Sequence, residues 1–506
     1  MARLVCTVLL YWDRSTSMPS DAPATTALGT RVVNAVLWRS GSQIVAQMVV
    51  WSATFVVIRL LNPGDYGLFA MSQVVLILLS LLNGSGFADA LVRAERVGER
   101  DVAQVFGILV LLNGGIALAQ VLLAPLIADY YDEPIIAQLL RVQALLYLAN
   151  PFILVPAALL SRAMDFRRQA RVNLLSALAG ALASVACAVA GFAVWTLVAA
   201  PLAMAWTRAI GMTLASPMRV RPSFDLGGAG ATIRFGGAML LSTALWLVQT
   251  QSDVIIAARS LDVHSLGLYT TSLFLAQIVT SKFVPPLNEV AFTAYARLQG
   301  DRAEAAGAFE KSVRIVMLAT MPLFFGLAVT AEPLVATMLG PKWVEIPPIV
   351  ARLALAMPFV VLQIMFTPAT SALGHPRIQV LSAAAGAVIM PVAFVFGVAE
   401  GARGLATAWL VAFPLLTVVT ASLAMPIIGV GVGALTRAIA PALFCALGMA
   451  LVVAAANTRL GEMPTPVRLA TLIAIGGLVY AGLIMVVARQ TVLSIWGLFA
   501  RRPALP

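Results

Sequence analysis

The residues that could do chemistry in this sequence are a few charged and amide side chains inside long apolar segments. Asp253 is an acid within the apolar segment 235–258. A charge at the centre of a membrane costs about 2.5–3.5 kcal/mol on insertion scales, so each such residue is a functional candidate by default. Asp253 could bind a proton or a sodium ion as an ion-coupling group. It could equally form a structural pair with a neighbouring arginine, such as Arg259 about 9 Å away by helical rise.

Amide side chains accompany the charged residues. Gln249 and Gln251 flank Asp253 as candidate hydrogen-bond donors. In the first apolar segment, Arg39, Gln43 and Gln47 recur at helical spacing and would form one polar stripe along a helix. We expect that stripe to face a substrate cavity. The alternative is that Arg39 only extends its side chain to the membrane surface.

Three further arginines are candidates for binding an anion. Arg141 and Arg352 lie early in two long apolar segments, and Arg208 lies near the end of the segment 193–215. A guanidinium group donates paired hydrogen bonds to phosphate and carboxylate groups, so these arginines would suit a pyrophosphate or an acidic sugar. Anchoring at the membrane surface is the alternative for Arg141 and Arg352.

The composition requires a membrane setting for these residues. The chain of 506 residues is 61% hydrophobic and only 11% charged, with a mean hydropathy of +0.95. A soluble protein has about 45–50% apolar and about 25% charged residues. The net charge of +11 could suggest nucleic-acid binding, but the basic residues lie mainly in alternate short loops. That pattern orients a membrane protein, so the expected environment is a lipid bilayer and not nucleic acid.

The cysteines and histidines do not indicate a metal centre. Three cysteines lie far apart without metal-ligand spacing, and both histidines lie beside predicted loops. No phosphate-binding Gly-x-x-x-x-Gly-Lys-Ser/Thr loop occurs. We therefore expect no metal, no cofactor, no catalytic residues and no ATP hydrolysis by this chain.

Segments of about 20 apolar residues can cross a bilayer as helices, and the sequence contains about fourteen. The predicted fold class is thus an all-α membrane protein. The predicted spans are residues 33–60, 68–84, 105–128, 135–160, 172–190, 193–215, 235–258, 266–284, 313–331, 349–373, 380–398, 405–424, 435–455 and 467–487.

Loop charges orient these spans. Arginine clusters follow the even-numbered spans, whereas the break after the third span is acidic at residues 129–133. By the positive-inside rule, the even-numbered breaks and both termini are cytoplasmic. Residues 1–29 are interpreted as a disordered cytoplasmic tail. A signal peptide, or a true start at Met18, is the alternative for this stretch.

An internal repeat organises the spans. Residues 59–69 align without gaps on residues 259–269, and four positions are identical. Each copy joins the first and second spans of a six-span block, which predicts duplicated, parallel halves with a central cavity between them. The predicted segments are two six-helix bundles, 30–226 and 227–425, followed by two additional spans and a cytoplasmic tail in 426–506.

Some local features also allow predictions. Residues 285–311 read as an amphipathic surface helix with interleaved charges. A short element over 332–339 leads into Lys342 and Trp343, which would suit an anchor at the membrane surface. Pro151 and Pro156 are expected to kink the fourth span.

Five stretches of the sequence resemble those of a known family. Residues 59–69 and 251–261, together with the stretches Ala296-Arg-Leu-Gln, Glu332-Pro-Leu-Val and Gly340-Pro-Lys-Trp, resemble the polysaccharide transporter (Wzx-like) family of the MOP flippase superfamily. The similarity spans roughly residues 30–425. One departure is Asp262-Val-His-Ser, where relatives usually carry a turn that contains glycine.

The resemblance implies a flippase of the bacterial cytoplasmic (inner) membrane. Its substrate would be a polyprenyl-pyrophosphate-linked oligosaccharide, carried to the periplasmic leaflet by alternating access for exopolysaccharide, O-antigen or capsule synthesis. A polymerase and other assembly proteins would be its partners. Alternative functions are a lipid II flippase, a cation-coupled MATE-type exporter, and a membrane glycosyltransferase or polymerase.

Overall fold

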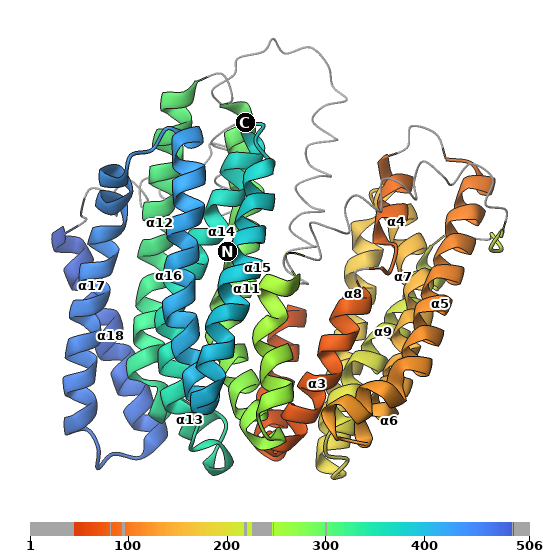
Figure 1. The fold of residues 1–506 in the computed structure, drawn as a ribbon, viewed down its shortest axis with the longest axis horizontal. Coiled ribbons are helices and arrows are strands. Elements are labelled where there is room, and N and C mark those ends of the chain that lie inside the picture. The colour runs from red at the N-terminus through yellow and green to blue at the C-terminus, as the bar shows by residue number, and fades with distance from the viewer. Residues whose placement is uncertain are drawn as a thin grey trace. The chain divides into compact units, whose positions relative to one another are not determined.

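The computed structural model describes residues 45–80, 82–93, 97–216, 220–224, 245, 247–298, 301–487 and 489. Over these residues the chain forms helices and no strand, as the apolar segments predict. It divides into two compact units, residues 1–243 and 244–506 (Figure 1). The predicted boundary after residue 226 lies outside the described residues, and residues 426–506 fall within the second unit.

The first unit contains the helix Val45–Leu60 and seven labelled helices. Their packing joins α5 to α7, α7 to α9 and α8 to α9. The bounds are α3 (Pro63–Ser80), α4 (Ser85–Arg93), α5 (Glu99–Tyr131), α6 (Ile135–Gln143), α7 (Leu145–Arg162), α8 (Phe166–Val189) and α9 (Trp195–Ala215).

The second unit begins with helical residues 247–260. Its packing joins α12 to α14, α14 to α16 and α15 to α16, which are the same pairs of spans as in the first unit. The bounds are α11 (Val263–Arg297), α12 (Arg302–Val329), α13 (Ala331–Met338), η2 (Pro341–Trp343), α14 (Pro347–Ala372), α15 (Arg377–Gly397), η3 (Val398–Glu400), α16 (Gly401–Ile428), α17 (Val432–Arg459) and α18 (Thr465–Val487). The last two helices, α17 and α18, pack on each other. In addition, α17 packs against α12 and α18 packs against α13.

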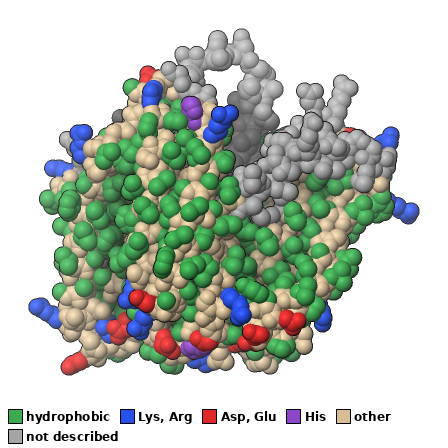
Figure 2. Space-filling view, in the orientation of Figure 1, with side chains coloured by type: hydrophobic (Ala, Val, Ile, Leu, Met, Phe, Trp, Pro, Cys, Tyr) green, Lys and Arg blue, Asp and Glu red, His purple; other side chains and the backbone are tan. Residues whose placement is uncertain are grey.

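Ten segments of the described chain are long and apolar enough to cross a membrane. One of these segments, Arg377–Ile428, contains both α15 and α16. Figure 2 shows apolar side chains over the middle of the helices and charged side chains near their ends. The chain is therefore a multi-pass membrane protein, whereas the exact number of fourteen spans stays a prediction.

The internal repeat corresponds to matching helix starts. α3 begins at Pro63 and α11 begins at Val263. In the first copy the Asp65 carboxylate accepts a hydrogen bond from the Asn62 backbone N–H at 3.0 Å. In the second, Asp262 precedes the helix and accepts from the Ser265 backbone N–H at 3.1 Å. The two copies thus use opposite halves of a capping box, so Asp262 supplies the helix start without a glycine.

Two local expectations are wrong. Residues 285–311 do not form a separate surface helix, because α11 extends to Arg297 and α12 starts at Arg302. Trp343 is fully buried and does not anchor a surface. The fourth span of the first unit is interrupted at Ala144, between α6 and α7. Pro151 and Pro156 lie inside α7, and a kink at these prolines stays a prediction.

Buried amides hold that break in place. The Gln143 side chain donates to Ser72 Oγ at 3.0 Å, which ties α6 to α3. Gln120 Nε2 on α5 donates to the Leu140 carbonyl at 2.7 Å. Lipid offers no hydrogen-bond partner to a polar group, so these side chains bond to a neighbouring helix. Such bonds fix the position of one helix along the other, which apolar contacts alone do not determine.

A close backbone approach fixes residues 220–224 on α5. The Ser223 N–H donates to the Ala103 carbonyl at 2.8 Å. A Cβ atom at Gly107 would lie 1.9 Å from the Ser223 carbonyl oxygen. Only glycine at position 107 allows this contact.

We expect Gly107→Ala to lower the free energy of unfolding by about 1–3 kcal/mol, because the new methyl group must displace Ser223. The measurement is the thermal unfolding midpoint of the purified protein in detergent. Gly115→Ala on the same helix is the control, because a Cβ atom there meets open space. Equal midpoints for the two variants would contradict the proposed contact.

Asp262 should make stability depend on pH. Hydrogen bonding from Ser265 lowers the pKa of the Asp262 carboxyl below its ordinary value. A lowered folded-state pKa means that the cap stabilises the protein above the unfolded pKa near 4, and that this gain is lost as pH falls through the folded-state pKa.

We therefore expect Asp262→Ala to destabilise the protein near pH 7, by about 0.5–2 kcal/mol as for other helix caps. The difference from wild type should shrink near pH 3, measured as unfolding midpoints at both pH values. Asp262→Asn is the control, since an amide caps without titrating. A wild-type advantage of the same size at both pH values would rule this account out.

Candidate functional site

The most enclosed charged side chain of the described chain is Asp253, on the helical residues 247–260. Its side chain is 1% exposed, and Tyr269 on α11 is 0% exposed. The Tyr269 hydroxyl donates to Asp253 Oδ2 at 2.7 Å. Trp409 Nε1 on α16 in turn donates to the Tyr269 hydroxyl at 2.7 Å. Three segments of the second unit therefore meet at one carboxylate.

Aromatic packing surrounds this hydrogen-bonded chain. The Trp409 ring stacks on the Phe413 ring with ring centroids 4.6 Å apart. The ring centroid of Phe394 on α15 lies 6.1 Å from that of Trp409. Phe394, Trp409 and Phe413 are all buried, so the hydrogen-bonded chain lies among apolar side chains. The low polarity strengthens each hydrogen bond and raises the free-energy cost of an ionised carboxylate.

The carboxylate keeps unused hydrogen-bonding capacity. Asp253 Oδ1 is buried and has no hydrogen-bond partner among the described residues. Two buried hydroxyls on the same helices, Ser252 Oγ and Thr271 Oγ1, also lack partners there. The expected alternative of an Arg259 ion pair is wrong, because the carboxylate bonds to Tyr269 and the Arg259 side chain is exposed. Asp253 Oδ1 therefore has capacity to carry a proton or to accept a further hydrogen bond.

The two flanking glutamines have different surroundings. Gln249 is 7% exposed, and its side chain lies against α15 where a Cβ atom at Gly386 would be 2.5 Å from Gln249 Cδ. Gln251 is half-buried. Gln249 is therefore a packing residue in this structure, which leaves Gln251 as the more accessible amide.

The candidate arginines also differ. Arg39 and Gln43 lie outside the described residues, and Gln47 is half-buried. Arg141 on α6 is exposed. Arg352 is half-buried, and its Nη1 donates to the Pro348 carbonyl of its own helix at 3.1 Å.

Among the candidate arginines, Arg208 on α9 has a buried donor without a partner, a feature that it shares with Arg314 on α12. Arg208 is half-buried, and its Nε is buried without a hydrogen-bond partner among the described residues. A buried donor without a partner is rare in native proteins. Arg208 therefore has capacity to bind an anion that the described structure does not supply.

Sequence reasoning missed Tyr269 and Trp409. Tyr269 is the last residue of the second copy of the repeat and aligns with Phe69 in the first copy. The hydroxyl group that distinguishes the two residues was the sequence feature that could have identified Tyr269. Trp409 is 140 residues from Tyr269 in sequence, and no periodicity links the two. Among the described residues, no group of three or more His, Cys, Asp or Glu side chains could hold a metal ion.

Solved structures of low sequence identity share this fold. The lipid II flippase MurJ, in an inward closed conformation, aligns with a TM-score of 0.71 at 13% identity, over 90% of this chain and 99% of that chain. An inward-facing multidrug resistance MATE family transporter of the MOP superfamily aligns with a TM-score of 0.56 at 15% identity, over 76% and 94%. The likeness confirms the predicted fold class.

Sequence relatives identify the family. The chain is 27% identical over 352 residues to the succinoglycan biosynthesis transport protein ExoT of Rhizobium meliloti strain 1021, covering 70% of this chain and 71% of ExoT. It is 24% identical over 311 residues to the lipopolysaccharide biosynthesis protein WzxC of Escherichia coli K12, covering 59% and 61%. The family model described as polysaccharide biosynthesis protein matches residues 56–348. Because that match covers more than half of the chain, this protein belongs to the polysaccharide biosynthesis protein family.

Proposed function

We propose that this protein is a flippase that moves a polyprenyl-pyrophosphate-linked oligosaccharide from the cytoplasmic to the periplasmic leaflet of a bacterial inner membrane. The main support for this proposal is the match to the family model over residues 56–348, a range that includes helices of both units. The names of two relatives, a succinoglycan transport protein and a lipopolysaccharide biosynthesis protein, support a polysaccharide precursor as the substrate.

A transporter fits the architecture better than an enzyme does. The described helices are joined mostly by short turns, such as residues 298–301 between α11 and α12. Two units with the same helix-packing pairs are suited to alternating access, in which one repeat moves against the other around a substrate site. We place both termini in the cytoplasm on the loop charges alone.

Arginines are proposed to bind the pyrophosphate of the substrate. Arg208 is the best supported, since its buried Nε lacks a partner among the described residues. Arg141, Arg352 and Arg39 are further candidates. An anion bound at Arg208 would satisfy a donor that now has none, and charge-assisted hydrogen bonds are about twice as strong as neutral ones.

Asp253 is proposed to couple an ion gradient to transport. A buried carboxylate with one oxygen unsatisfied is costly when ionised and uncompensated. Binding a proton or a sodium ion removes that cost, and release restores it. The Tyr269 and Trp409 hydrogen bonds join the carboxylate to α11 and α16, so a change of occupancy can alter how these helices pack.

A lipid II flippase is the second candidate function. The observation that favours it is the alignment with MurJ over 90% of this chain. Growth of a strain that lacks its own lipid II flippase, supported by this protein, would select that function over export of polysaccharide repeat units.

We expect the protein to restore surface polymer in at least one of a panel of bacterial strains that each lack their own repeat-unit flippase. Arg208→Ala should lower surface polymer about tenfold or more, equivalent to about 1.4 kcal/mol in the transport barrier. The measurement is cell-surface polysaccharide per cell, with membrane levels of the protein matched by immunoblot.

Arg403→Ala is the control for charge removal, because Arg403 is exposed at the start of α16. Normal polymer from Arg208→Ala would remove this residue from the substrate site. Absence of polymer in every strain, with the protein present in the membrane, would count against the flippase.

Asp253→Asn should abolish gradient-driven export. The amide retains an oxygen that can accept from the Tyr269 hydroxyl, but it neither ionises nor releases a proton. We expect about tenfold less polymer than wild type, and no further response to a protonophore or a sodium ionophore. Asp129→Asn is the matched control, since Asp129 is exposed. Wild-type export by Asp253→Asn would exclude coupling through this carboxylate.

A further inference from the structure

One face of α8, in the first unit, combines two arginines with an exposed apolar surface. Arg167 and Arg171 lie four residues apart in the first two turns of the helix, and both are exposed. Leu175, Leu182 and Val189 follow on the same face at helical spacing and are 59%, 70% and 73% exposed. These five residues are named the α8 stripe. The loop charges place its arginines at the cytoplasmic end of the helix.

The opposite face of α8 is packed against α9. It buries small residues that include Ala177, Gly180 and Ser184. A Cβ atom at Gly180 would lie 3.1 Å from the Ala200 carbonyl oxygen on α9, so the two backbones approach closely there. This packing fixes the rotation of α8 about its own axis. The α8 stripe therefore points away from α9, with its arginines and its apolar residues on one line.

The arginines of the stripe have no acidic partner on their own helix. The sequence of α8 contains no aspartate or glutamate. Asp165, just before the helix, accepts from the Arg168 backbone N–H at 3.1 Å and pairs with the Arg168 guanidinium at 3.2 Å. Arg171 makes no side-chain hydrogen bond or ion pair among the described residues. Like charges four residues apart repel each other on a helix, so an external anion would stabilise this arrangement.

The charges at the start of α12, in the second unit, are arranged differently. There the basic residues Arg302 and Lys311 alternate with the acids Glu304 and Glu310. A basic residue next to an acid has a partner of opposite charge within the protein. The unmixed positive charge of the α8 stripe is therefore a property of this helix and not of every helix start with basic residues.

An anionic phospholipid matches both parts of the stripe. Guanidinium groups donate paired hydrogen bonds to phosphate oxygens, and an acyl chain can cover the leucines that follow. Lys and Arg next to a membrane are attracted to anionic headgroups. A zwitterionic headgroup also brings an ammonium group, for which the stripe offers no carboxylate. A soluble anion would contact the arginines but leave the apolar part uncovered.

We infer that the α8 stripe is a binding site for an anionic phospholipid of the cytoplasmic leaflet. The site shares no residue with Asp253 or Arg208 and does not depend on the proposed transport function. A bound headgroup would neutralise the repulsion between Arg167 and Arg171 and would lie beside the helix pair α8–α9.

The test uses the full-length protein purified in detergent. Native mass spectrometry measures how much phosphatidylglycerol and phosphatidylethanolamine the protein retains from an equal mixture. We expect the wild type to retain phosphatidylglycerol preferentially. One arginine near an anionic lipid surface contributes about a fivefold gain in binding. The double variant Arg167→Gln with Arg171→Gln should therefore bind phosphatidylglycerol about 25-fold more weakly.

The matched control removes the same charge from the second unit, as Lys311→Gln with Arg437→Gln, because both residues are exposed. It should bind phosphatidylglycerol as the wild type does. Equal thermal unfolding midpoints show that both double variants fold. Equal loss of phosphatidylglycerol from the two double variants would mean that binding follows net charge alone, and this result overturns the site. Wild-type binding by the Arg167 and Arg171 double variant overturns it as well.

Two further ligands separate the lipid from other anions. Excess inorganic phosphate should not displace phosphatidylglycerol, since it cannot cover the apolar part of the stripe. Displacement by phosphate would indicate a site for a soluble anion and would overturn the inference. Farnesyl diphosphate represents the pyrophosphate of the proposed substrate. If the Arg167 and Arg171 double variant loses farnesyl diphosphate but keeps phosphatidylglycerol, the two arginines bind substrate and the lipid site is excluded.

Discussion

Hydrogen bonds between helices are the constraint on which the rest of this structure depends, because lipid offers no partner to a buried polar group. In the second unit, Trp409 and Tyr269 satisfy one oxygen of Asp253 and bring α11 and α16 to the helix that carries it. In the first unit, Gln143 and Gln120 serve the same purpose at the break between α6 and α7. Apolar surface alone would let these helices slide, since they are as apolar as the surrounding lipid.

The same constraint separates residues that are satisfied from residues that are not. Most buried polar groups have a partner, so the free Oδ1 of Asp253 and the free Nε of Arg208 are exceptions within the described residues. A carboxylate oxygen can accept from a cation, and a guanidinium N–H can donate to an anion. The proposed flippase function would use one group of each kind.

Duplication explains why the two units share their packing but not their chemistry. Helix starts at Pro63 and Val263 and the common packing pairs come from the repeated pattern of apolar and capping residues. Asp253 corresponds to Ala53 in the first copy, and Tyr269 corresponds to Phe69. A carboxylate and its hydroxyl donor therefore occur together in one unit, while an apolar pair occupies the equivalent positions of the other.

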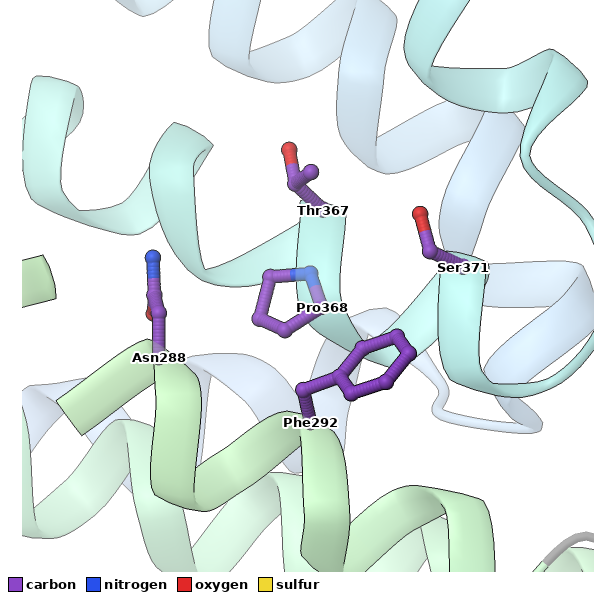
Figure 3. A pocket seen from close by; sticks show the side chains of 5 residues that line it. All are labelled: Asn288, Phe292, Thr367, Pro368 and Ser371. Atoms are coloured by element: carbon purple, nitrogen blue, oxygen red, sulfur yellow. The ribbon is translucent and has the colours of Figure 1, made fainter. Parts of the chain in front are cut away.

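The sequence by itself determined the helical membrane class, the approximate helices and the repeat, because hydrophobic length, capping residues and similar loop sequences are local properties of the chain. It also singled out Asp253 and Arg208, since an ionisable residue in an apolar segment is visible without a fold. Tertiary structure decided the rest. The fold placed Trp409 within hydrogen-bond distance of Tyr269. It also packed Gln249 against Gly386 and buried Trp343 within the second unit. The pocket between α11 and α14, lined by Phe292 and Ser371 (Figure 3), likewise depends on helix packing. These contacts join residues far apart in sequence, and only the packing of one helix on another places such residues within hydrogen-bond distance.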